Sequence, residues 1–128
     1  MSSPDYLPEN DDDVVDLSYV LELGGSKPDF IKQVLTIFME NTPSGLTDLA
    51  ELILKKTDNW EEISKQAHFL KSSFGIVNVK GMQERLQHIE SLAKEKRDRP
   101  QIEKQLGEMQ EIFARAEKII VRKMEDAS

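Results

Sequence analysis

The 128-residue chain is long enough for one domain with a single hydrophobic core. Its 24 acidic and 17 basic side chains give a formal net charge of −7, and no basic run could follow a phosphate backbone, which argues against nucleic acid and anionic membranes as partners. Without cysteine, the chain has no disulfide, thiolate nucleophile or cysteine-ligated zinc. It has neither a signal-peptide pattern nor an apolar run long enough to span a bilayer, which predicts a cytoplasmic location.

The N-terminal part of the sequence predicts a tail followed by a short helix. Residues 1–15 are acidic, contain two prolines and lack a periodic apolar face, as disordered segments do. Asp16 is a candidate N-cap for a short helix that the glycine pair at Gly24 ends. A second helix is expected to begin with Ser26 as its cap and Pro28 in its first turn.

The helical period continues through the rest of the chain. Thr42 followed by Pro43 predicts a kink or a restart in the second helix. Asp58, with Glu61 three residues later, resembles a capping box that begins the next helix, which is expected to end near Val77. The other apolar residues predicted to face the core are Phe30, Val34, Ile37, Phe38, Leu46, Leu49, Ala50, Ile53, Met82, Leu86, Ile89, Ala93, Ile102, Leu106, Met109, Phe113, Ala116 and Ile120.

No strand-like alternation and no hairpin signal interrupts this pattern. The sequence therefore predicts an all-α fold, an antiparallel four-helix bundle with a short additional N-terminal helix. We expect the bundle to span residues 16–122, between the tail at 1–15 and a C-terminal tail at 123–128, and the protein to be a monomer.

His68 points away from the apolar stripe of its own helix. Each helical residue advances about 100°, which places the stripe roughly 100–180° to one side of His68. The residues within about 60° of His68 are small or flexible, and the serines and the glycine among them weaken the helix. This indicates a surface cleared for the approach of another protein; an ordinary solvated face, with helix fraying at Gly75, is the alternative. The stripe is Ile63, Ala67, Leu70, Phe74 and Val77, and the residues around His68 are Ser64, Lys65, Lys71, Ser72 and Gly75.

The neighbouring helix offers a partner for the imidazole. If the turn between the two helices centres near Val79, His68 and Glu90 lie at the same height of an antiparallel hairpin. A Glu90 carboxylate that accepts a hydrogen bond from Nδ1–H would fix the tautomer and leave Nε2 as a nucleophile. Gln87, one turn earlier, is the alternative orienting residue, and a solvated Glu90 is the other possibility.

An exposed, oriented imidazole with Lys71 one turn away suits phosphoryl acceptance, because an ammonium group can offset the charge of phosphohistidine. A serine hydrolase would need a water-excluding cleft with an oxyanion hole, which an exposed helix face does not offer. A carboxylate-bridged metal bundle would need a Glu three residues before a His, and neither His68 nor His88 has one. We therefore expect no metal and no cofactor, and we interpret His88 as a surface residue beside Glu84.

The segment His68-Phe69-Leu70-Lys71-Ser72 resembles the His-x-Leu-Lys-Gly motif of histidine-containing phosphotransfer (HPt) domains of two-component phosphorelays. The stretches "DLSYVLELGGSKPDFIKQVLTIFMENTP" and "DNWEEISKQAH" also resemble that family, so the resemblance covers roughly residues 16–122. Two positions depart from the pattern. Ser72 replaces the motif glycine, and Asn78 stands where a second glycine is usual, ten residues after the histidine.

The resemblance implies that His68 is the phosphorylated residue, that Lys71 steadies the phosphoryl group and that Glu90 hydrogen-bonds the imidazole. The implied reaction is reversible transfer between His68 and the aspartate of a response-regulator receiver domain, with a hybrid sensor histidine kinase upstream. The receiver would hold the Mg²⁺. Because the chain has no nucleotide-binding domain, it is expected to be a phosphocarrier without ATP-dependent kinase activity.

A receiver would dock over the small residues around His68 and over an apolar flank beside them. Phe69 and Ile76 lie about 80–100° from His68, away from the core stripe, so they either form this flank or pack on another helix of the bundle. The competing function is a non-catalytic interaction bundle, which would depend on the docking residues but not on the imidazole. The predicted docking residues are Ser64, Lys65, Phe69, Ser72, Gly75 and Ile76.

Overall fold

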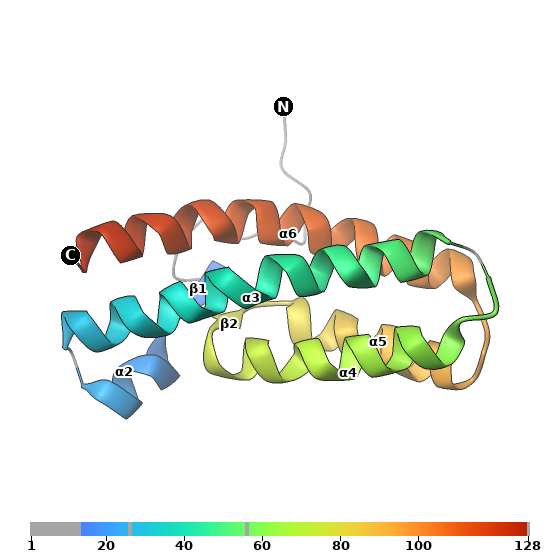
Figure 1. Cartoon of the computed structure of the whole chain (residues 1–128), viewed down its shortest axis with the longest axis horizontal. Helices are drawn as coiled ribbons and strands as arrows, with labels where there is room; N and C mark the ends of the chain where they lie inside the picture. Colours follow the sequence, from blue (N-terminus) through green and yellow to red (C-terminus); the bar gives the residue numbers. More distant parts are fainter. Residues whose placement is uncertain (1–13, 26, 56, 128) are drawn as a thin grey trace.

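The computed structural model describes residues 14–25, 27–55 and 57–127. The described chain has four long helices and one short helix. The long helices lie alongside one another and alternate in direction, and the short helix lies beside the start of the first (Figure 1). The predicted all-α bundle with a short N-terminal helix is confirmed. Along the chain the elements are β1 (Val15–Asp16), α2 (Ser18–Gly24), α3 (Pro28–Leu54), α4 (Trp60–Ile76), β2 (Asn78–Val79), α5 (Met82–Lys94) and α6 (Arg99–Asp126).

The core lies between the four long helices, each of which contacts two neighbours in the order α3, α4, α5, α6 and back to α3. Phe38, Phe74 and Phe113 meet at its centre, and the Phe74 ring lies edge-on to both others at centroid distances of 5.5 and 6.1 Å. The predicted inward positions of α4, α5 and α6 are all buried. In α3 the prediction fails at Ile37, which is exposed, whereas Leu35 is fully buried.

Helix α3 runs without interruption through Pro43, so the predicted restart is wrong. An interior proline removes one backbone hydrogen bond and costs about 3 kcal/mol. The apolar residues before and after Pro43 pack on the same core, and we infer that this burial outweighs the local cost. Thr42 is buried inside the helix and does not cap a new one.

Two of the predicted helix starts are shifted along the chain. The carboxylate of Asp16 accepts a hydrogen bond from the Ser18 amide at 2.9 Å, although Leu17 occupies the N-cap position. Asp58 does not cap α4, which begins after Asn59. The predicted cap at Ser26 lies outside the described residues.

The loop between α3 and α4 is held by side chains and not by a capping box. The Asn59 amide group donates to the Leu52 carbonyl at 2.6 Å. The Arg99 guanidinium donates to the carbonyl oxygens of Ile53 and Thr57 at 2.7 and 2.8 Å and lies 4.5 Å from the centre of the Trp60 ring. The start of α6 is therefore fastened to this loop.

The predicted boundaries of the domain change at both ends. Val14 and Val15 are buried in the core, so they do not belong to a tail, and residues 1–13 lie outside the described part. Val15 pairs with Val79 across the antiparallel β1 and β2 strands, and the Lys80 amide donates to the Val14 carbonyl at 2.9 Å. At the other end, α6 continues to Asp126, so residues 123–126 belong to the helix.

In the part of the chain that the structure describes, no helix combines the length and the apolar character needed to cross a membrane.

Replacing Val15 by alanine should lower the free energy of unfolding by about 2 kcal/mol, because the substitution leaves a cavity beneath the α4–α5 turn. Val121→Ala is the matched control: Val121 is exposed on α6, so the loss there should stay within about 0.5 kcal/mol. Urea denaturation followed by circular dichroism measures both values. Equal stabilities of the two variants would contradict the assignment of this segment to the core.

Candidate functional site

His68 lies on the outer side of α4, and 72% of its side chain is exposed. The short connection between α4 and α5 consists of β2 and a turn in which Gly81 has a φ of +92°. This connection makes the two helices an antiparallel pair and brings Glu90 of α5 opposite the imidazole. Nδ1 of His68 lies 3.2 Å from Oε2 of Glu90, as the hairpin register predicts.

The Glu90 carboxylate is buried, with only 4% of its side chain exposed, and it contacts two lysines. Lys71 Nζ lies 2.6 Å from Oε1, and Lys94 Nζ lies 3.0 Å from Oε2. Burial raises the pKa of Glu90, but the hydrogen bonds and charges of the two lysines outweigh burial and lower it from 4.5 to about 2. Glu90 is therefore ionised at neutral pH.

An ionised carboxylate can only accept hydrogen bonds, and this fixes the roles of the two imidazole nitrogens. Nδ1 of His68 must carry the proton that it donates to Glu90. In the neutral ring, Nε2 then holds the lone pair. The site thus combines a nucleophilic nitrogen on an exposed side chain with a buried anion behind it.

Lys71 connects Glu90 to a second polar side chain. Its ammonium group donates to Oε1 of Gln87 at 2.6 Å, and the Gln87 amide group in turn donates to the Ser91 hydroxyl at 3.0 Å. Gln87 therefore binds the lysine and not the imidazole, which makes it wrong as the alternative orienting residue. The lysine lies one turn after His68, as the sequence predicts.

The residues around His68 are not uniformly exposed. Ser64 is buried and lies beside the end of α5, where it lines a small hollow together with Ala93 and Lys94, so its prediction as a docking residue is wrong. Lys65 is exposed and forms an ion pair with Glu61 at 3.2 Å.

Ser72 is exposed, and its hydroxyl donates to the Phe69 carbonyl of the same helix at 2.7 Å. The exposed surface around His68 is thus built from Lys65, Ser72 and Gly75.

The bundle itself does not require glycine at position 75. A Cβ atom there would have Gln83 Nε2, at 3.5 Å, as its nearest neighbour, which is an ordinary contact distance. At Gly45, by contrast, a Cβ would lie 2.8 Å from a methyl group of Leu70, so this glycine lets α3 and α4 pack closely. Asn78 lies in β2, and the left-handed conformation of the turn falls on Gly81.

Phe69 and Ile76 are 63% and 45% exposed, which excludes the alternative that they pack inside the bundle. Ile76 lines an apolar groove of about 280 Å³ together with Leu23 of α2 and Ile37 of α3. We call Leu23, Ile37, Phe69 and Ile76 the apolar patch. The sequence did not indicate Leu23 and Ile37, because Ile37 shares the helical spacing of core residues and α2 is too short for a clear period.

Lys94 belongs to the site, although its position in the sequence did not indicate this. It lies four residues after Glu90 on α5, a spacing that favours an ion pair on a helix surface. The spacing alone does not reveal that the carboxylate is buried and faces the imidazole.

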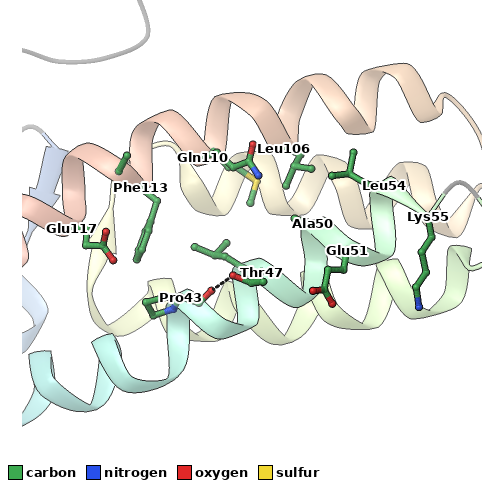
Figure 2. A pocket seen from close by; sticks show the side chains of 13 residues that line it. Pro43, Thr47, Ala50, Glu51, Leu54, Lys55, Leu106, Gln110, Phe113 and Glu117 are labelled. Carbon is green, nitrogen blue, oxygen red and sulfur yellow. Dashed lines mark hydrogen bonds between the residues drawn. The ribbon is translucent and has the colours of Figure 1, made fainter.

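A groove larger than the one at Ile76 lies away from this site. This groove has a volume of about 730 Å³ and lies between α3 and α6. Figure 2 shows Ala50, Leu54 and Phe113 among the residues that line it. Neither histidine lines it. Among the described residues, no three acidic or histidine side chains gather as a metal site would require.

Replacing Glu90 by glutamine should remove a pH-dependent part of the stability. The folded pKa of Glu90 lies below its ordinary value of 4.5, so its ion pairs stabilise the protein at higher pH and are lost as the pH falls toward 2. Glu90→Gln should be less stable than wild type at neutral pH by on the order of 2 kcal/mol, and the difference should vanish in acid. Urea titrations at a series of pH values test this. Glu61→Gln, on an exposed carboxylate, should follow wild type; parallel curves for wild type and Glu90→Gln would refute the ion-pair assignment.

Comparison with known proteins identifies the family of this chain. A family model described as the Hpt domain matches residues 33–119, which include His68, Lys71, Glu90 and Lys94. No curated protein and no solved structure matched significantly. Hpt domains are phosphocarriers in two-component signalling, where they interact with receiver domains and histidine kinases. The matched segment covers most of the chain and nearly all of the four-helix bundle, and the chain belongs to the Hpt domain family.

Proposed function

We propose that this protein is a phosphorelay intermediate that accepts a phosphoryl group on Nε2 of His68 and exchanges it with the aspartate of a response-regulator receiver domain. The observation that carries this proposal is the exposed imidazole whose Nδ1 is bonded to the ionised Glu90. A hybrid sensor histidine kinase would supply the phosphoryl group upstream. The receiver would provide the Mg²⁺.

In the transfer step, the Nε2 lone pair of His68 attacks the phosphorus of the aspartyl phosphate. The nitrogen–phosphorus bond forms while the bond to the aspartate oxygen breaks, and the aspartate leaves as a carboxylate. The proton on Nδ1 stays in place, so the ring becomes cationic and the Glu90 carboxylate 3.2 Å away stabilises it. Lys71 offsets the charge of the phosphoryl group.

A protein partner fits this site better than a small molecule does. His68 stands on an exposed helix and not in a cavity, so the second half of the reaction centre must come from outside. Gly75 has no packing role within the bundle, which supports a role in close approach by a partner. The apolar patch, with Phe69 and Ile76 about 80–100° around α4 from His68, gives a receiver an apolar surface to cover.

Incubation with phosphoramidate should add one phosphoryl group to wild-type protein, with ammonia as the leaving group. Intact-mass spectrometry should show the adduct in wild type and no adduct in His68→Ala. His88→Ala is the matched control, because His88 is also exposed but lies on α5, where no carboxylate of the described residues is bonded to its imidazole, and it should react like wild type. The adduct should be lost in acid and kept in base, as expected for phosphohistidine.

Absence of the adduct on folded wild-type protein would contradict phosphoryl acceptance. It would favour the alternative of an interaction bundle that retains the Hpt fold without the chemistry. An adduct that persists in His68→Ala would contradict the assignment of the residue.

Replacing Ile76 by serine should slow transfer to a purified receiver domain by roughly tenfold, because a central apolar contact is lost. Loading from phosphoramidate should not change, since that reaction needs no docking. Leu54→Ser is the matched control: Leu54 is 58% exposed, against 45% for Ile76, but lies at the far end of α3. The transfer rate is measured as the loss of the phosphoryl group from His68. Equal transfer rates for the two variants would rule out this docking surface.

A further inference from the structure

The proposed chemistry gives Lys71 two tasks. In the unphosphorylated protein its ammonium group is bound to Glu90 Oε1 and to Gln87, both at 2.6 Å. To offset the charge of a phosphoryl group on His68, this ammonium must turn at least partly away from Glu90. The buried carboxylate would then lose one of its two cations, and an unpaired buried charge is strongly unfavourable.

Lys94 can compensate for that loss. Its Nζ lies 3.0 Å from Glu90 Oε2, the oxygen that also accepts the hydrogen bond from His68 Nδ1. Lys94 is on α5, one turn after Glu90, so this ion pair does not depend on α4, which carries His68 and Lys71. Its side chain is 67% exposed and has no other described partner.

We propose that Lys94 is a positioning residue that frees Lys71 for the phosphoryl group. While Lys71 turns to the phosphoryl oxygens, Lys94 stays on Oε2 and keeps Glu90 ionised and bonded to Nδ1–H. The imidazole then keeps its orientation throughout the transfer. This inference rests on the proposed function, and it assigns the regulation of Lys71 to a residue of the neighbouring helix.

The test measures the rate at which phosphoramidate loads His68. Lys94→Gln should load roughly fivefold more slowly than wild type, as expected for the loss of an ion pair whose lysine is largely exposed. Lys94→Arg should restore most of the rate, because it keeps the cation. Lys104→Gln changes the net charge equally at an exposed position of α6 and should load at the wild-type rate.

A double-mutant cycle of Lys94 and Glu90 shows whether Lys94 acts through Glu90. In a Glu90→Gln background no buried carboxylate holds Lys71, so adding Lys94→Gln should change the rate less than twofold. The ¹⁵N spectrum of the imidazole gives a readout that does not need the reaction: Lys94→Gln should retain the Nδ1–H tautomer, since Lys71 still keeps Glu90 in place before loading. Circular dichroism confirms that each variant is folded.

The outcomes separate the two proposals. Loading of wild type with no difference between Lys94→Gln and Lys104→Gln would overturn the role of Lys94 and leave the phosphocarrier function standing. An equal loss of rate in the wild-type and Glu90→Gln backgrounds would overturn the action through Glu90. No loading of wild type would overturn the phosphocarrier function and this inference with it.

Discussion

The buried carboxylate of Glu90 is the constraint on which the site depends. Removing a carboxylate from water is costly unless cations and hydrogen-bond donors satisfy it, and here three groups do so. His68 and Lys71 come from α4, and Lys94 comes from α5. The carboxylate can be satisfied only if the two helices lie at one relative height. The helix arrangement that stabilises the buried charge of Glu90 is therefore the same one that orients the reactive nitrogen of His68.

The rest of the bundle keeps that height fixed. The aromatic cluster of Phe38, Phe74 and Phe113 joins three of the long helices, and Phe74 lies on α4 below the imidazole-bearing surface. Gly45 allows α3 to pack closely against α4 at Leu70. The side chain of His68 can therefore be exposed and still have a fixed position, because packing on the inner face of α4 fixes the helix that carries it.

Local patterns predicted much of this arrangement. The short α4–α5 connection limits how the two helices can pair, so counting residues from the turn sufficed to place Glu90 opposite His68. Helical periodicity likewise located the apolar faces of α4, α5 and α6. Prediction failed where the outcome depends on elements distant in the sequence. Ser64 has the position of a surface residue on α4, but it is buried beside the end of α5.

Two other failures have the same origin. Pro43 is a strong local signal against a continuous helix, but packing on both sides of it decided the outcome. Val14 and Val15 lie in an acidic segment without a period, and strands of two residues are too short to show alternation. Their burial depends on a partner strand beyond α4, which no local window contains.

The pairing of β1 with β2 also has a consequence for slow motions of the protein. The turn between α4 and α5 would by itself be a site of easy local opening, since turns at the ends of helix pairs have few backbone hydrogen bonds. Here the Lys80 amide is bonded to Val14, and Val79 is covered by Val15. Opening the turn therefore requires the N-terminal strand to detach as well. The two helices that carry the site are coupled in this way to the β1 segment, and they should exchange their amide hydrogens as one cooperative unit with it.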